Sequence, residues 1–106
     1  MTDPFQALGD PTRREILALL GTRARSVQEL ADALPVSRPA VSRHLRVLKN
    51  AGLVSEEAVG VRHIYRLHAH GLDAVRQYLT GVWGEAAVRF QLLAENISEH
   101  TDEAER

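Results

Sequence analysis

A pair of short helices separated by the turn at residues 35–37 constrains the fold of this chain more than any other feature. Ser26 is followed three residues later by Glu29, which is the spacing of a capping box, and apolar residues then recur at helical spacing. Ser37 is a good N-cap for a second helix, which has a proline in its first turn. Two helices joined by so short a turn favour a helix-turn-helix.

One helix is expected before this pair and another well after it. Asp10 and Pro11 suit the N-cap and first helical position, and the apolar residues that follow form one face of a helix that we expect to end at Gly21. A shorter helical turn is expected to precede it. Beyond Gly71, apolar residues step by three or four as far as Ile97, which predicts a long helix with a wide apolar seam.

A hairpin completes the predicted fold. Segments 53–59 and 62–67 flank Gly60 and are rich in β-branched and aromatic residues, which predicts two paired strands. The fold class is therefore mainly α with a small β-hairpin: a winged helix-turn-helix of about five helices and a two-stranded wing. A chain of 106 residues suits one domain, expected over 1–97, and the acidic segment 98–106 is expected to be a disordered tail.

The second helix of the pair concentrates positive charge. The stretch "SRPAVSRHLRVLKNAGLV", residues 37–54, carries three arginines and one lysine but no acid, in a chain whose net charge is only -1. Val41, Leu45 and Leu48 recur at helical spacing and are expected to face the core, which leaves the basic side chains outward. A helix fits the DNA major groove, where arginine can donate two hydrogen bonds to guanine. A solvated charged face would have the same composition, but the adjoining capped helix, turn and hairpin favour DNA binding.

Position along this helix predicts a role for each basic residue. Side chains near the start of such a helix reach base edges and later ones meet phosphates, so Arg43 is expected to read bases and Lys49 to contact the backbone. In the hairpin turn, Arg62 is expected either to enter a minor groove or to keep an edge strand from pairing with another molecule. The predicted DNA-binding residues are Ser37, Arg38, Pro39, Ser42, Arg43, His44, Arg46, Lys49, Arg62 and His63.

The last helix is expected to pack against a second subunit. Its apolar seam is broader than one small core requires, small domains gain stability from a partner, and helix-turn-helix proteins commonly bind DNA as two-fold dimers. The alternative is that this helix only closes the core of one subunit. Gly81 and Gly84 within it would allow either close backbone packing or a kink. The predicted interface residues are Phe5, Leu8, Tyr78, Leu79, Val82, Trp83, Ala86, Phe90 and Leu93.

Composition excludes several other classes of protein. The chain has no cysteine, so it forms neither disulfides nor thiolate metal sites. We find no export signal and no run approaching the ~18 apolar residues of a membrane span, so a cytoplasmic location without a membrane partner is expected. No set of catalytic residues has convincing spacing, so we expect neither an enzyme nor a cofactor.

The stretches "DPTRREILALL", "SVQELADALPVSRPAVSRHLRVLKNAGLV" and "RHIYRL" resemble the ArsR family of winged-helix repressors. The closing segment, which contains Trp83, is similar to the cysteine-free, SdpR-like branch of that family. The resemblance implies a homodimer whose first and last helices form the interface. It also implies repression of transcription, often of the protein's own operon, through binding to double-stranded operator DNA.

The sequence departs from the metal-sensing members of this family. Their best-known site is a Cys-x-Cys pair in the helix before the recognition helix, where this chain reads "ELAD" at residues 29–32. His68 and His70 could bind zinc or nickel with Asp73 or His100 of a partner, but such histidines are more often exposed loop residues, so no metal is expected. Two further functions stay open: a winged helix that binds an acidic protein partner, and an architectural DNA binder without sequence preference.

Overall fold

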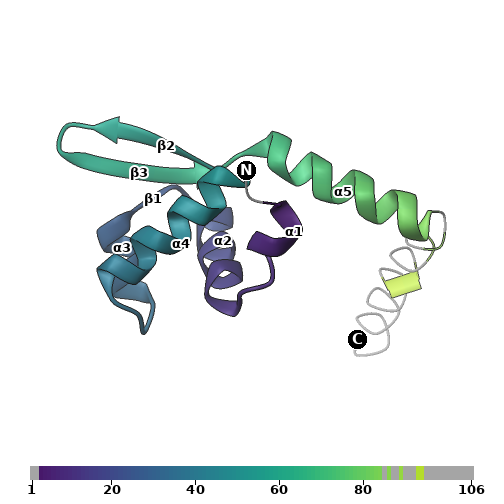
Figure 1. Ribbon diagram of the computed structural model, residues 1–106, viewed down its shortest axis with the longest axis horizontal. Helices are drawn as coiled ribbons and strands as arrows, with labels where there is room; N and C mark the ends of the chain where they lie inside the picture. Colours follow the sequence, from purple (N-terminus) through teal and green to yellow (C-terminus); the bar gives the residue numbers. More distant parts are fainter. Residues whose placement is uncertain (1–2, 85, 87–88, 90–92, 95–106) are drawn as a thin grey trace, which may run out of the picture. The chain divides into compact units, whose positions relative to one another are not determined.

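The computed structural model describes residues 3–84, 86, 89, 93 and 94. Contacts divide the chain into two compact units, Met1–Asp73 and Ala74–Arg106. The first unit contains the helix-turn-helix and the sheet (Figure 1). Within the described residues, no helix is both long enough and apolar enough to cross a membrane.

Hydrogen-bonded caps start the helices of the first unit. These helices are α1 (Pro4–Ala7), α2 (Pro11–Thr22), α3 (Val27–Ala33) and α4 (Arg38–Asn50). Asp10 caps α2 by accepting a hydrogen bond from the backbone N–H of Arg13 at 3.1 Å. Ser26 and Glu29 form the predicted capping box at the start of α3, with both N–H···O distances at 3.1 Å. Ser37 caps α4 by accepting from a backbone N–H at 3.3 Å, so all three predicted caps are confirmed.

The wing belongs to a three-stranded antiparallel sheet. Its strands are β1 (Arg25–Ser26), β2 (Val54–Val59) and β3 (Arg62–Leu67), in the order β1-β3-β2. β2 and β3 form the predicted hairpin, with Val54 opposite Leu67. β1 is not predicted from the sequence, and it joins the sheet by pairing Ser26 with Ile64. Ser26 therefore ends a strand and caps α3 at the same time.

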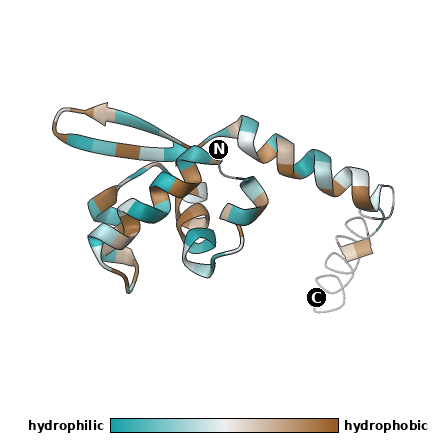
Figure 2. Ribbon diagram, viewed as in Figure 1, coloured by the Kyte–Doolittle hydropathy of each residue, from teal (hydrophilic) through white to brown (hydrophobic). Residues whose placement is uncertain are grey.

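The hydrophobic core holds the helix-turn-helix against the base of the wing. Its largest fully buried side chains are Ile16, Leu30, Val41, Leu45, Leu48 and Leu53. They come from α2, α3, α4 and the segment just before β2, and each contributes roughly 1.5–3 kcal/mol through burial. Figure 2 shows α4 with both hydrophobic and hydrophilic segments, as expected for a helix that buries only one face.

Two glycines that were expected at the ends of helices, Gly21 and Gly71, lie inside helices instead. α2 continues through Gly21 to Thr22, so the predicted stop at Gly21 is wrong; a glycine in the last turn of a helix is tolerated. The fifth helix, α5 (Ala69–Trp83), already includes Gly71, which is buried. A Cβ at Gly71 would collide with the carbonyl oxygen of Gly52. Close approach of two backbones therefore explains this glycine.

α5 ends earlier than the sequence predicts. Its last residue is Trp83, and Gly84 follows with a φ of 53°, in the left-handed region where glycine is favoured. Gly81 stays inside α5, and a Cβ placed there would have no neighbour within 4 Å. Beyond Gly84 the structure describes only residues 86, 89, 93 and 94, so the predicted tail at 98–106 lies outside the described residues.

Candidate nucleic-acid interface

α4 has one buried face and one exposed basic face. Val41, Leu45 and Leu48 are fully buried, which fixes the rotation of the helix about its axis. Arg43 and Arg46 are exposed, and neither forms a hydrogen bond or ion pair with any residue that the structure describes. Each guanidinium therefore offers its five N–H donors to a ligand.

Two other basic side chains of α4 already have partners within the protein. Arg38 Nη1 donates a hydrogen bond to Gln28 Oε1 at 3.1 Å. Lys49 Nζ lies 2.9 Å from Oε1 of Glu56, which is on β2. The basic face of α4 thus divides into two arginines in its middle, which form no hydrogen bond or ion pair among the described residues, and two cations nearer its ends that have such partners.

The other residues of this region that are predicted to contact DNA lie on or beside the same helix. Ser37 uses its hydroxyl as the N-cap, Pro39 is exposed, and Ser42 is half-buried. His44 is half-buried, and its Nδ1 lies 3.4 Å from Nη1 of Arg13 on α2. His44 is therefore in contact with the body of the protein, in addition to lying on α4.

The two predicted wing residues both contact carboxylates. Arg62 opens β3, and its Nη2 lies 3.2 Å from Oε1 of Glu29. His63 Nδ1 lies 3.1 Å from Oε2 of Glu56. The residue that projects from the turn is Val61, which is 98% exposed. The wing tip itself is therefore apolar, and the cationic side chains lie beside it.

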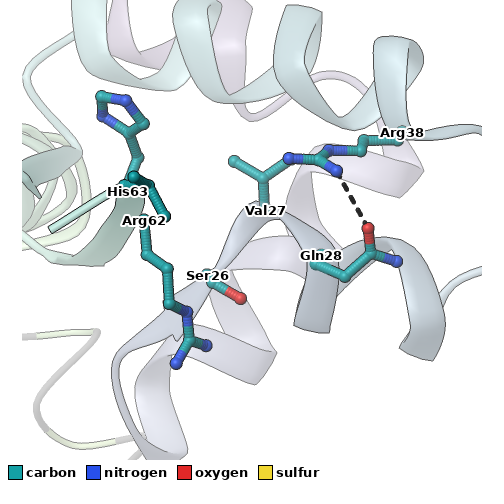
Figure 3. A pocket seen from close by; sticks show the side chains of 7 residues that line it. Ser26, Val27, Gln28, Arg38, Arg62 and His63 are labelled. Carbon is teal, nitrogen blue, oxygen red and sulfur yellow. Dashed lines mark hydrogen bonds between the residues drawn. The ribbon is translucent and has the colours of Figure 1, made fainter. Parts of the chain in front are cut away.

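Three predicted DNA-binding residues border one recess of about 220 Å³. The recess is lined by Ser26, Val27, Gln28, Arg38, Val61, Arg62 and His63. Figure 3 shows Arg38 and Gln28 on one side, joined by their hydrogen bond, with Arg62 and His63 on the other. The fold thus brings the start of α4 and the wing, which are far apart in the sequence, beside the start of α3.

Glu29 links the wing to α3. Its Oε2 lies 2.7 Å from Nη1 of Arg23, while Oε1 contacts Arg62 and accepts the backbone N–H of Ser26. The hydrogen bond from Arg23, followed by that from Ser26, lowers the pKa of Glu29 from 4.5 to about 2, so this carboxylate is ionised at neutral pH. From the sequence only the capping-box role of Glu29 is predicted, because its contact with Arg62 depends on the pairing of β1 with β3.

Glu56 is a second carboxylate at this site, and its role is not predicted from the sequence. The hairpin register places it opposite Tyr65, whose hydroxyl donates to Oε2 at 2.7 Å. Burial and then this hydrogen bond raise the pKa of Tyr65 to about 12. The signal that could have found the pair is the register of the hairpin, which the imperfect alternation of β2 and β3 leaves open.

Many of the predicted interface residues are exposed apolar side chains. In the first unit, Phe5 is 39% exposed and Leu8 is half-buried. In the second unit, the exposed residues are Tyr78, Leu79, Val82 and Trp83 of α5, together with Ala86 and Leu93. Phe90 lies outside the described residues. Several large apolar side chains exposed on one short helix are typical of a protein–protein interface.

The two histidines considered for a metal site are neighbours at the start of α5. The ring centroids of His68 and His70 are 5.7 Å apart, and His70 lies within the first turn of the helix. Nδ1 of His68 is buried without a hydrogen-bond partner among the described residues. The described part of the chain holds no group of three side chains placed to bind a metal ion.

Comparisons with known proteins agree with this geometry. A family model described as "Bacterial regulatory protein, arsR family" matches residues 10–56. The HTH-type transcriptional regulator Rv2034 of Mycobacterium tuberculosis is 44% identical over 97 residues, which cover 92% of this chain and 91% of that protein. The transcriptional repressor SdpR of Bacillus subtilis is 37% identical over 64% of this chain and 76% of its own length.

A solved structure has the same fold. The crystal structure of a possible transcriptional regulator for arsenical resistance superposes with a TM-score of 0.73 at 37% sequence identity. The match covers 90% of this chain and 97% of that one. The match therefore extends well beyond the helix-turn-helix.

Proposed function

Since this chain belongs to the ArsR family of bacterial regulatory proteins and is a transcriptional regulator rather than an enzyme, we propose that it is a homodimeric repressor that binds a two-fold symmetric DNA operator sequence-specifically. It acts in the cytoplasm, on double-stranded DNA, and its operator lies upstream of its own gene. The similarity to SdpR supports its place in the SdpR-like branch of the family.

Arg43 and Arg46 of α4, whose guanidinium groups form no hydrogen bond or ion pair with a described residue, carry the DNA-binding part of this proposal. A buried face formed by Val41, Leu45 and Leu48 holds the helix in place, so Arg43 and Arg46 project from a fixed surface. Arginine donors held in this way can pair bidentately with guanine or with phosphate. Arg43, nearer the start of α4, reads a base edge, and Arg46 contacts the backbone.

The dimer is supported by the apolar side chains that each unit leaves exposed. Phe5 in α1 and Leu79, Val82 and Trp83 in α5 are all between 39% and 55% exposed in the single chain. Burying them in a partner would remove apolar surface from water, which favours association. A two-fold dimer places two copies of α4 about one helical turn of DNA apart, ~10 base pairs, or a multiple of it.

Footprinting on the DNA upstream of the protein's own gene tests the proposal. The expected result is protection of two similar half-sites whose centres are ~10 base pairs apart or a multiple of this. Sedimentation of the protein alone is expected to give the mass of two chains. A protein that sediments as a monomer and protects no DNA, but is captured by an acidic protein, would favour the alternative role as a protein-binding module.

A further inference from the structure

A carboxylate of the wing faces the basic end of α4. Glu56 accepts a hydrogen bond from Lys49 Nζ through Oε1 at 2.9 Å. Its Oε2 accepts from the Tyr65 hydroxyl at 2.7 Å and lies 3.1 Å from Nδ1 of His63. Two of these three partners, Lys49 and His63, are among the residues that the sequence predicts to contact DNA. In the free protein, the Glu56 carboxylate therefore binds two side chains that are predicted to bind DNA.

This acid comes from a different element than the cations it meets. No acid occurs between Ser37 and Val54, so the charge of α4 is not balanced within its own helix. Hydrogen bonds from Lys49 and Tyr65 lower the pKa of Glu56, and the side chain is only 24% exposed. Glu56 is therefore ionised at neutral pH and less screened by water than a fully exposed carboxylate would be.

We propose that Glu56 is an internal competitor for DNA: it holds Lys49 in the free protein, must release it when a phosphate arrives, and so lowers the affinity for every duplex. The inference rests on the proposed DNA-binding function. A phosphate next to Lys49 also brings a second negative charge close to Glu56, and their repulsion adds to the hydrogen bond that is lost. The loss of affinity is independent of base sequence, because Lys49 is predicted to contact the DNA phosphate backbone, whereas Arg43 is predicted to contact the bases.

The neighbouring residue provides a matched control. Glu57 lies on the same strand, and its side chain is on the opposite face of the sheet because side chains alternate along a strand. Its Oε2 pairs with Nη2 of Arg66 at 2.9 Å, a residue outside the proposed DNA contacts. Glu57→Gln therefore removes the same charge from the same strand without releasing Lys49.

The experiment measures binding to a fluorescein-labelled duplex of random sequence, about 20 base pairs long, by anisotropy over a series of salt concentrations. Glu56→Gln is expected to bind about threefold to tenfold more tightly than wild type at low salt, with a salt slope steeper by about 1. Glu57→Gln is expected to change affinity by less than about twofold. In a Lys49→Ala background, Glu56→Gln is expected to lose most of its gain.

Thermal unfolding of each variant shows whether it is folded. If Glu56→Gln is unfolded, Glu56→Asp replaces it; the carboxylate is then one methylene further from Lys49, and a smaller gain in the same direction is expected. Equal affinities of the Glu56 and Glu57 variants would overturn the inference. Weaker binding after Glu56→Gln, or a gain of undiminished size in the Lys49→Ala background, would also overturn it. A wild-type protein that binds no duplex at low salt would overturn the proposed function instead, so the two failures are distinguishable.

Discussion

Nη1 of Arg13 on α2 lies 3.4 Å from Nδ1 of His44 on α4, so the helix with the proposed DNA contacts is tied to the helix beside it. The same guanidinium donates through Nε to the carbonyl oxygen of Ala7 at 2.6 Å and through Nη2 to that of Gln6 at 3.3 Å. Because a guanidinium has no acceptor, His44 accepts through Nδ1. Arg13 thus joins α1, α2 and α4.

Replacing Arg13 by lysine should destabilise the first unit. Lysine keeps the charge but cannot reach three acceptors in a fixed fork, so a loss of about 1–2 kcal/mol in the free energy of unfolding is expected. Urea unfolding followed by circular dichroism measures it. Arg14→Lys is the control, because Arg14 is exposed and, among the described residues, its side chain donates to the Leu8 carbonyl alone, so its change should stay within about 0.5 kcal/mol. Equal losses in the two variants would contradict the bridging role of Arg13.

Stability at low pH should depend on Glu29. Its pKa is lowered from 4.5 to about 2 in the folded protein, so its ionised form contributes stability above pH 4.5, and this contribution is lost as the pH falls towards 2. Glu29→Gln should therefore be less stable than wild type at neutral pH and should lose less stability between pH 4.5 and 2. Thermal melts across this range measure the difference.

Asp32→Asn provides the comparison for that experiment. Asp32 is an exposed carboxylate on the same helix, bonded to Gln28 and outside the capping box. Its substitution should leave the loss of stability between pH 4.5 and 2 close to that of wild type. If the stability of Asp32→Asn changed as little with pH as that of Glu29→Gln, the loss of stability at low pH would not be specific to Glu29.

Arg43 and Lys49 should differ in what they contribute to DNA recognition. Arg43→Ala is expected to relax preference at one base pair by about 1–3 kcal/mol, because it removes a base contact. Lys49→Ala is expected to weaken binding to all duplexes alike, because it removes a phosphate contact. It should also reduce the slope of the logarithm of the binding constant against the logarithm of the salt concentration by about 1. Binding titrations against an operator and its single-base variants separate the two effects. If both variants lost affinity equally for all sequences, the division of roles would be wrong.

A charge placed on the exposed apolar side of α5 should weaken the dimer. Leu79→Glu puts a carboxylate where apolar burial is proposed, and a loss of at least about tenfold in dimer affinity is expected. Gln77→Glu introduces the same side chain at an exposed position on a different side of the helix and should leave the dimer affinity nearly unchanged. Sedimentation equilibrium gives both constants. A Leu79 variant that dimerises like wild type would exclude this side of α5 from the interface.

Replacing two glycines of α5 by alanine should change the stability of the protein in opposite directions. Gly71→Ala brings a Cβ against the Gly52 carbonyl and the Leu53 backbone, so the protein should lose stability or the first turn of α5 should shift. Gly81→Ala meets nothing within 4 Å in the single chain, so better helix propensity should stabilise it by about 1 kcal/mol. Thermal unfolding tests both. A Gly81 variant that loses dimer affinity would instead indicate close backbone packing between subunits.

The helices and their caps could be predicted because the interactions that start them are local. Ser26 and Glu29 are three residues apart, so their capping box is visible in the sequence and is confirmed by two hydrogen bonds. The spacing of Val41, Leu45 and Leu48 likewise predicts the buried face of α4 correctly. The exposed basic face follows from the same period.

The contacts that partner the predicted cations could not be predicted, because they join distant residues. Arg62 and Glu29 are 33 positions apart and meet only because β1 pairs with β3. β1 has two residues, too few for an alternating pattern to be recognised. The role of Gly71 was equally hidden, since nothing in its neighbourhood in the sequence indicates that Gly52 will lie against it.

Ser26 is the last residue of a strand and the cap of the next helix, and no linker residue separates the two. A displacement of β3 would therefore be transmitted through β1 to α3, because no flexible linker separates β1 from α3. Any effector that displaced the wing would move the helix packed against α4 as well. In this protein, the geometry of the wing and the presentation of the DNA-reading helix should change together or not at all.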